Sequence, residues 1–225
     1  MNRGEPVQVW AVDLDQARPD LDWPLLDAVE RSRAVRLVRP SDRRRFIARR
    51  AALRRLLARP VGSAPEALRF AAGPAGRPLL PGCSLDFNLS HRGAIALVAL
   101  SRAGRIGVDV EQVDAAQVEL AVLRPFVDGQ VLVDVGRARD AGDARPFFRW
   151  WTVDEAVAKA RGTGIAEDRP PLAGRRWLSG VQALDDRGQA GAWRLHTWEP
   201  APGYVATLAL PQGSPAPHLH PLSAN

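Results

Sequence analysis

Apolar and polar residues alternate over residues 7–15, VQVWAVDLD, with the period of two that is typical of a half-buried strand. Between residues 85 and 111, the runs LDFNLSH, AIALVAL and RIGVDVE predict three more strands, with the turn SRAGR joining the last two. Three further candidates lie near the end of the chain: RWLSGVQAL, GAWRLHTW and GYVATLAL. The pattern therefore predicts strands in both the first and the second part of the chain.

Two segments have the apolar spacing of a helix. A short one covers roughly residues 25–37, and a strong one follows in PSDRRRFIARRAALRRLLAR, where Ser41 or Asp42 can cap the first turn. The apolar stripe of this second helix consists of Phe46, Leu53, Leu56 and Leu57. Another helix is expected in FFRWWTVDEAVAKARG, where Gly162 and Gly164 are suited to the C-terminal end.

The two parts of the chain have weak sequence similarity to each other, as in an internal repeat. VWAVDLD in the first part is similar to RIGVDVE in the second, and RRRFIARRAALRRLLA is similar to FFRWWTVDEAVAKARG. Two similar units of about 100 residues that face each other would enclose a cleft. We therefore expect an N-terminal half at residues 1–102 and a C-terminal half at residues 103–225.

Two segments have no clear pattern. The portion DGQVLVDVGRARDAGDAR, residues 128–145, is either poorly ordered or a loop that faces a partner. The last residues, 211–225, are rich in Pro and polar residues and are expected to form a flexible tail. His218 and His220 in this tail have a spacing that can bind metal, but a loose chain end is the preferred interpretation.

Composition excludes several classes of protein. The 225 residues contain one cysteine, Cys83, which can make neither an internal disulfide nor a cysteine zinc site. The chain has no apolar run of membrane-spanning length, and its start lacks an apolar signal core. We therefore expect a cytoplasmic protein without a membrane partner. The net charge of +6 favours acidic partners, although the dominance of arginine over lysine weakens that clue.

The run GVDVE places Asp109 and Glu111 on one face of its strand and Val108 and Val110 on the other. Carboxylates about 7 Å apart repel each other by roughly 2 kcal/mol at an effective dielectric of about 20. A divalent cation between the two groups would remove this repulsion, and so would solvent on an exposed strand face. Both interpretations fit this pair alone.

Glu155 and Lys159 lie on one helical stripe with Trp151, at spacings of four residues. Lys159 is the only lysine of the chain. The simplest interpretation is an ordinary Glu–Lys pair along a helix. The alternative is a third carboxylate that meets the strand pair, with a lysine one turn further on that contacts a phosphate.

Ser90 and His91 end the predicted strand LDFNLSH, where short polar groups can bind phosphate oxygens. They do not indicate a hydrolytic triad, because neighbouring residues of a strand point to opposite faces. A histidine in such a place is more often a structural hydrogen-bonding group than a catalytic one.

Four motifs in order, GRP, FNLSH, GVDVE and WTVDEAVAKARGTGI, resemble those of the 4′-phosphopantetheinyl transferases of the surfactin-synthetase-activating (Sfp-like) branch. The resemblance covers about residues 7–210. It implies an α+β fold of two pseudo-twofold-related α/β halves with the active site in the cleft between them. The N-terminal half would then bind the 3′-phosphate of coenzyme A, and the C-terminal half the metal and the pyrophosphate.

The resemblance also implies an activity. Such enzymes transfer the 4′-phosphopantetheine arm of coenzyme A to a serine of an acyl or peptidyl carrier protein and release adenosine 3′,5′-bisphosphate. Asp109, Glu111 and Glu155 would hold Mg²⁺ or Mn²⁺, and Glu155 would act as general base. The expected contacts to coenzyme A are Arg33, Arg45, Arg77, Ser90, His91 and Lys159, whereas Arg50 and Arg54 either contribute or face solvent. An acidic carrier domain would suit the positive chain, which we expect to be a monomer.

Three departures from the family pattern stand out. Asp154 occupies a position where the family has lysine, FVDGQ at residues 126–130 is a poor copy of an aromatic motif, and Gln112 and Val113 replace a basic residue after GVDVE. An inactive copy that only binds coenzyme A or a carrier is therefore the alternative. An arginine-rich nucleic-acid binder is a weaker one, because only Phe46 interrupts the arginines of its helix and that residue belongs to the apolar stripe.

Overall fold

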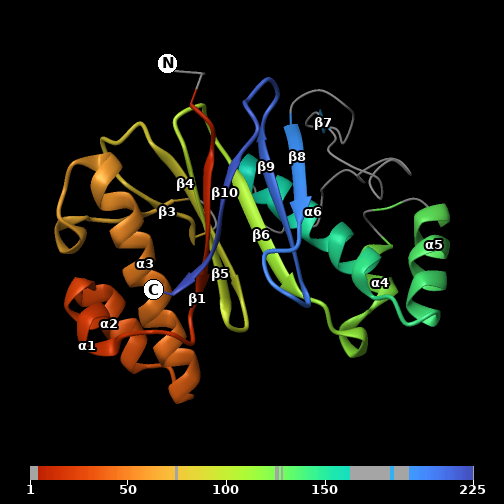
Figure 1. Ribbon diagram of the computed structural model, residues 1–225, viewed down its shortest axis with the longest axis horizontal. Coiled ribbons are helices and arrows are strands. Elements are labelled where there is room, and N and C mark those ends of the chain that lie inside the picture. The colour runs from red at the N-terminus through yellow and green to blue at the C-terminus, as the bar shows by residue number, and fades with distance from the viewer. Residues whose placement is uncertain are drawn as a thin grey trace.

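A computed structural model describes residues 5–73, 76–124, 127, 129–162, 183–184 and 193–224. Two four-stranded sheets lie face to face in the centre of the molecule, with α3 outside the first sheet and α6 outside the second (Figure 1). The first sheet has the strand order β10-β1-β5-β4, and the second has the order β6-β9-β8-β7. Among the described helices, none is long and apolar enough to cross a membrane.

The first sheet is built on the predicted strands of the first part of the chain. Its strands are β10 (His218–Ala224), β1 (Gln8–Asp13), β5 (Ile95–Ser101) and β4 (Asp86–Arg92). Helix α3 (Pro40–Val61) packs on its outer face through the predicted apolar stripe, in which Leu53 and Leu57 contact Phe87 and Leu100. The helical period of the sequence thus decides which side of α3 faces the sheet.

Three short elements pack against α3: α1 (Pro19–Asp22), the 3₁₀ turn η1 (Trp23–Leu25), and α2 (Ala28–Val35). Asp27 and Glu30 form a reciprocal capping box at the start of α2. The prediction that Ser41 or Asp42 caps α3 is wrong. Pro40 is the first helical residue and Arg39 is the N-cap, so both residues lie within the first turn; proline suits that position because its missing N–H would have no helical partner.

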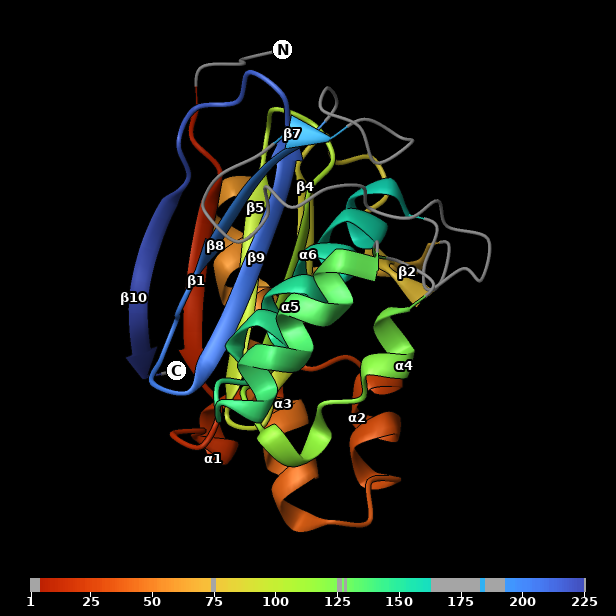
Figure 2. The same cartoon turned by 90° about the vertical axis from the view of Figure 1, so that its right-hand side faces the viewer.

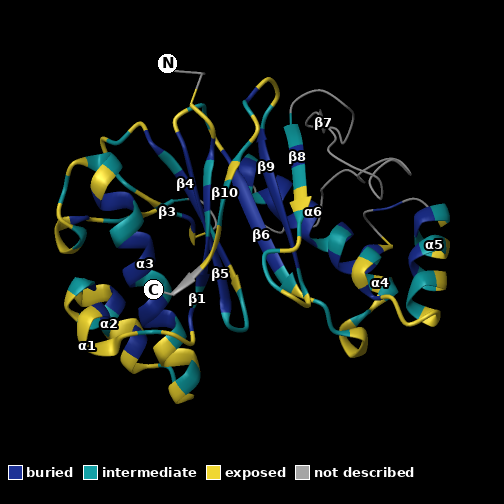
Figure 3. Ribbon diagram, viewed as in Figure 1, coloured by how far each residue is buried: buried dark blue, intermediate teal, exposed yellow. Residues whose placement is uncertain are grey.

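The second sheet consists of β6 (Gly107–Gln112), β9 (Tyr204–Pro211), β8 (Trp193–Trp198) and β7 (Ala183–Leu184). Helix α6 (Arg145–Arg161) covers its outer face and is buried along most of its length (Figure 3). Gly107 explains how closely the helix approaches, because a Cβ at this position would lie 2.0 Å from the backbone oxygen of Ala156. A backbone contact of this kind requires glycine.

Residues 128–145 are neither a loop nor disordered in their described part, which corrects the expectation from sequence. Gly129–Asp140 form α5, whose Val131 and Val135 are buried against the core around α6. Valines four residues apart face the same side of a helix, and this weak apolar stripe explains the packing. The preceding segment contains the 3₁₀ turn η4 (Ala115–Gln117) and the short helix α4 (Leu120–Leu123).

The two halves repeat one arrangement. In each half a first strand, β1 or β6, precedes a long helix, and an antiparallel hairpin follows whose second strand pairs with the first strand. Apolar side chains of the two sheets meet in one core, which contains Val9 and Leu97 from the first sheet and Val108 and Leu208 from the second. The α+β fold with two similar halves, expected from the sequence, is confirmed.

The end of the chain is a strand and not a flexible tail, which corrects the expectation for residues 211–225. Strand β10 pairs in parallel with β1, at the outer edge of the first sheet (Figure 2). The ring of His220 stacks on Trp10 with a centroid distance of 4.6 Å, and Leu219 packs against the core between the sheets. The last residues therefore belong to the sheet of the N-terminal half, because β1 offers them an unpaired edge.

The remaining predictions concern short segments. The predicted strands GAWRLHTW and GYVATLAL correspond to β8 and β9, whereas RWLSGVQAL is described only at β7 and otherwise lies outside the described residues. Gly164 also lies outside them, as do Phe126 and Asp128 of FVDGQ. The segment GPAGRPLLPG contains β3 (Pro78–Leu79), which pairs with β2 (Ala71–Ala72) in a two-stranded sheet, and the 3₁₀ turn η2 (Pro65–Ala67) precedes them.

Candidate functional site

Side chains of β4 join the two halves. Three residues at alternating positions point from β4 toward β6: Asp86 accepts a hydrogen bond from the Ile106 N–H and Asn88 from the Val108 N–H, both at 2.8 Å. Ser90 donates its hydroxyl to Asp109, also at 2.8 Å. The strand period of two places all three on one side of β4. The FNLSH motif therefore holds β6 beside β4 through side chains.

Asp109 and Lys159 form the centre of this junction. The ammonium Nζ lies 2.6 Å from Asp109 Oδ1, 3.0 Å from the Ser90 hydroxyl and 3.2 Å from the Val108 carbonyl. Asp109 is only 4% exposed, and its second oxygen, Oδ2, has no hydrogen-bond partner in the described part of the chain. The opposite face of β6 carries Val108 and Val110 into the core, as the alternation predicts.

Glu111 lies two residues further along β6. Arg92 Nε lies 3.2 Å from its Oε2, which makes an ion pair without the geometry of a hydrogen bond. Burial, and then repulsion from Asp109, raise the pKa of Glu111 to about 7, although Arg92 and Lys159 act in the opposite direction. The carboxylate pair of GVDVE is thus a partly buried pair and not a solvated strand face.

Glu155 and Asp154 are both buried on α6, with exposed fractions of 9% and 7%. In the described residues, no group of three or more His, Cys, Asp or Glu side chains is arranged to hold a metal ion. The donor chemistry nevertheless fits Mg²⁺: Asp109, Glu111 and Glu155 supply only oxygens, and a buried oxygen of Asp109 lacks a partner. These side chains would have to rotate to share one ion.

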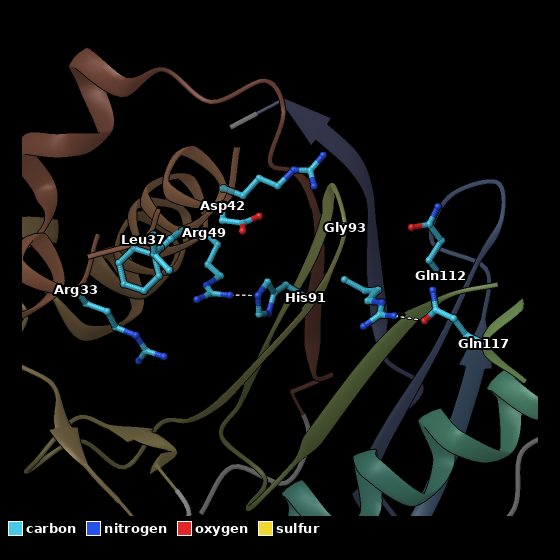
Figure 4. A pocket seen from close by; sticks show the side chains of 11 residues that line it. Arg33, Leu37, Asp42, Arg49, His91, Gly93, Gln112 and Gln117 are labelled. Carbon is cyan, nitrogen blue, oxygen red and sulfur yellow. Dashed lines mark hydrogen bonds between the residues drawn. The ribbon is translucent and has the colours of Figure 1, made fainter. Parts of the chain in front are cut away.

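An arginine-lined pocket of about 470 Å³ opens beside the junction (Figure 4). It lies between α3 and the ends of β4 and β6. Its basic residues are Arg33, Arg45, Arg49, His91 and Arg92. Arg49 and His91 point toward each other and share a hydrogen bond (Figure 4). Because a guanidinium can only donate, the Nε2 atom of His91 is the acceptor, so its imidazole is neutral in this structure.

Positive charge outweighs negative charge in this arginine pocket. Burial, and then the nearby cations Arg49, Lys159, Arg33 and Arg92, lower the pKa of His91 to about 4. Burial and two neighbouring arginines lower the pKa of Arg49 to about 10. Groups that resist protonation because of neighbouring cations indicate a site suited to an anionic ligand.

The predicted basic residues fall into separate groups. Arg33, Arg45 and His91 line the arginine pocket, although Arg45 also makes a two-pronged ion pair with Asp15 at 2.6 and 2.7 Å. Ser90 and Lys159 belong to the adjacent junction, whereas Arg77 does not line the pocket and instead contacts backbone and Asp86.

Arg50 and Arg54 were expected either to contribute to coenzyme A binding or to face solvent, and the structure shows neither. Both pair with the buried Glu30, Arg54 being 0% exposed, so neither faces solvent nor the arginine pocket. They are structural because a buried carboxylate requires a cation.

Arg49 and Arg92 are pocket residues that the sequence interpretation missed. Arg49 follows Arg45 by four residues on α3, so the helical period placed it on the same face and could have revealed it. Arg92 follows His91 at the end of β4, and it reaches the pocket because β4 packs beside β6. Only the fold supplies that information.

A second, smaller pocket of about 200 Å³ continues from the first. The two share Arg92 and Gln117. Four of the eight residues that line the second pocket are apolar (Val122, Phe147, Phe148 and Trp151), and Glu111 and Glu119 add two carboxylates. The two neighbouring pockets make a two-part cleft, in which the first part is cationic and the second part is about half apolar.

Comparison of the sequence with known proteins shows the family of this chain. Residues 105–209 match the model of the 4′-phosphopantetheinyl transferase superfamily. The chain is 33% identical over 191 residues to a candidate 4′-phosphopantetheinyl transferase of Synechocystis sp., covering 84% of this chain and 78% of that protein. It is 34% identical over 170 residues to the 4′-phosphopantetheinyl transferase HetI of Nostoc sp., covering 72% and 71%. The chain therefore belongs to the 4′-phosphopantetheinyl transferase superfamily and is a transferase of that class.

Proposed function

We propose that this transferase moves the 4′-phosphopantetheine arm of coenzyme A to a serine of a carrier protein and releases adenosine 3′,5′-bisphosphate. The two-part cleft is the observation that carries the proposal. Coenzyme A has several phosphates at one end and a thin, uncharged arm with two amide groups at the other. A cationic pocket of about 470 Å³ that adjoins a pocket of about 200 Å³ with both apolar and polar side chains has the same order of properties.

The nucleotide end would lie in the arginine pocket. Arg33, Arg49 and His91 would contact its phosphates. Burial is the main cause of the lowered pKa values of Arg49 and His91, and an anion there would offset the further contribution of the neighbouring cations. The pantetheine arm would pass Arg92 and enter the second pocket beside Trp151. Its pyrophosphate would then lie near Ser90, Lys159 and the carboxylates, in agreement with the order of the motifs.

Asp109, Glu111 and Glu155 would hold Mg²⁺, or Mn²⁺, at this junction. When bound, the ion supplies charge neutralisation for the pyrophosphate. Glu155 would accept the proton of the carrier serine as its oxygen forms the new bond to the phosphorus next to pantetheine. The bond from that phosphorus to the bridging oxygen breaks, and adenosine 3′,5′-bisphosphate leaves with the electron pair. Lys159 would contact a phosphate oxygen as a compact charge, and its ammonium would give up one of its three present acceptors to do so.

The partner would be an acidic carrier domain that meets a monomer of this positively charged chain. Among the relatives, the transferase of Eremothecium gossypii carries the name of a dehydrogenase, L-aminoadipate-semialdehyde dehydrogenase-phosphopantetheinyl transferase, and is 30% identical over 166 residues. It covers 65% of this chain and 59% of that protein.

Intact-mass spectrometry tests the proposal. Apo carrier domains from fatty-acid, polyketide and non-ribosomal-peptide synthesis are incubated with the protein, coenzyme A and Mg²⁺. We expect one carrier to gain the mass of one phosphopantetheine, and we expect the gain to disappear with EDTA or in Glu155→Gln. Glu66→Gln, a change at an exposed carboxylate on η2, is the matched control and should retain activity.

A second candidate function is binding without transfer. It is favoured by Asp154, which places a buried anion beside Glu155 where the family pattern has a lysine. Coenzyme A binding in calorimetry, with no mass gain on any carrier, would establish this alternative. Neither binding nor transfer would reject both.

A further inference from the structure

Arg77 joins the two halves of the molecule beside the proposed site. It precedes β3 in the first half and is only 9% exposed. Its Nη1 donates to the backbone oxygens of Lys159 at 2.7 Å and Ile106 at 3.1 Å. Its Nη2 donates to Asp86 Oδ2 at 2.7 Å and to the Phe87 oxygen at 2.8 Å. The guanidinium thus contacts β4 on one side and the elements of the second half on the other.

The number of donors limits what else Arg77 can bind. A guanidinium has five N–H donors, four on the two Nη atoms and one on Nε. The four protein acceptors use the Nη donors, and only Nε has no hydrogen-bond partner among the described residues. Two-pronged binding of a phosphate needs two neighbouring donors. The geometry of Arg77 is therefore that of a clamp between protein groups.

In the C-terminal half, Arg77 binds backbone oxygens that lie close to Lys159 and Asp109 of the proposed site. The Lys159 oxygen lies in the last turn of α6, where backbone carbonyls lack helical partners and a cation interacts favourably with the helix dipole. Ile106 immediately precedes β6, three residues before Asp109. Arg77 thus holds the backbones that carry Lys159 and Asp109, whose side chains meet at 2.6 Å.

We infer that Arg77 is a positioning residue that fixes Lys159 against Asp109 across the two halves, and not a ligand of coenzyme A. The inference deepens the proposed function, since it concerns the residues that would handle the pyrophosphate. Lysine cannot replace this arginine, because one ammonium at the end of a flexible stem does not span four acceptors in a fixed fork. Loss of the clamp would let the end of α6 move relative to β6.

Arg54 provides a matched control. Like Arg77, it is a buried arginine with four acceptors, which are Glu30, Asp27, and the backbone oxygens of Pro65 and Leu68. All of these acceptors belong to the first half. Arg54→Gln and Arg77→Gln each remove donors from buried acceptors and should both lower stability, but only Arg77→Gln should affect Lys159.

The single lysine makes the test direct. Protein labelled with ¹⁵N-lysine gives one side-chain ammonium resonance, that of Lys159, by NMR. Because a lysine variant would add a second ammonium resonance, glutamine replaces each arginine in this experiment. We expect Arg77→Gln to shift the Lys159 resonance and to speed its hydrogen exchange, and Arg54→Gln to leave both unchanged. Asp86→Asn, which weakens the clamp without removing it, should cause a smaller shift in the same direction; it serves as the readout if Arg77→Gln does not fold. An unchanged resonance in the folded clamp variants would overturn the inference.

Kinetics supply the second readout. A displacement of about 1 Å at a reacting group can cost on the order of 100-fold in rate. We expect Arg77→Lys to lower kcat for phosphopantetheine transfer by about 10- to 100-fold, with KM for coenzyme A within about twofold of the wild-type value. A raised KM with unchanged kcat would instead show that Arg77 is a ligand of coenzyme A.

The two readouts keep the inference separate from the proposed function. The NMR experiment needs no turnover. If the wild-type protein transfers nothing to any carrier while Lys159 still responds to Arg77 and not to Arg54, then the proposed function fails and the clamp stands. If transfer proceeds and Lys159 does not respond, the clamp fails alone.

Discussion

Lys159, on α6, directs its ammonium to Asp109, on β6, with 2.6 Å between Nζ and Oδ1. The same ammonium donates to Ser90 and to the Val108 oxygen, so its three N–H donors meet three acceptors. A planar guanidinium does not point its donors in these directions. This geometry gives a physical reason why a chain rich in arginine keeps its one lysine here.

Removing that ammonium should destabilise the protein, because it leaves the carboxylate of Asp109 buried without its cation. We expect Lys159→Met to lower the free energy of unfolding by about 3 kcal/mol, as measured by urea denaturation without divalent metal. Adding Asp109→Asn to this variant should recover a large part of the loss. A loss in the double variant equal to the sum of the losses in Lys159→Met and Asp109→Asn would show that the pair is not coupled.

Gly107 should tolerate no side chain. A Cβ there would lie 2.0 Å from the Ala156 oxygen and 2.5 Å from the Ala160 nitrogen, both backbone atoms of α6. We expect Gly107→Ala to cost about 3 kcal/mol or more, because α6 must move away from β6. Gly129→Ala is the control: a Cβ there meets no atom within 4 Å, and the stability should stay the same or rise. Thermal denaturation of both variants measures the difference.

His91 should make stability and ligand binding depend on pH. Its pKa is lowered to about 4 in the folded protein from 6.5, so between these values the unfolded chain binds more protons. The contribution of His91 to stability is therefore present above about pH 6.5 and is lost as the pH falls toward 4. His91→Asn should flatten this part of the profile, as urea denaturation of the variant and the wild type between about pH 4 and pH 7 measures.

An anion in the arginine pocket should reverse that shift. Adenosine 3′,5′-bisphosphate would offset the charges of Arg33, Arg49, Arg92 and Lys159 that disfavour protonation of His91, and its pKa would rise. At about pH 5.5 binding should then take up a proton, which calorimetry in buffers of different ionisation enthalpy detects. Proton uptake that persists in His91→Asn would contradict this assignment.

Arg49 should favour ligand binding and at the same time disfavour the stability of the ligand-free protein. Because burial and the cations Arg50 and Arg33 disfavour its charge, Arg49→Met should leave the ligand-free protein as stable as the wild type or more stable. Its affinity for adenosine 3′,5′-bisphosphate should fall about 10- to 100-fold, the value of one or two charge-assisted hydrogen bonds. Arg44→Met, at an exposed position of α3 that does not line the pocket, should bind normally. Equal affinities of the two variants would remove Arg49 from the site.

The sequence by itself determined the local elements and the family. The alternation of GVDVE placed Val108 in the core and Asp109 on the opposite face, and the helical period chose the side of α3 that meets the sheet. These are properties of neighbouring residues, which depend on the fixed repeats of strand and helix. The four ordered motifs added the superfamily, which the comparisons confirm.

Only the tertiary structure decided the partners of charged residues and the place of the chain end. Arg54 and Arg49 lie five residues apart on one helix, yet one is locked to Glu30 and the other faces the pocket. Strand β10 looked like a loose tail because its partner, β1, lies about 200 residues earlier in the chain. Electrostatic pairing and sheet pairing depend on distance in space, and the local pattern of a sequence contains no measure of that distance.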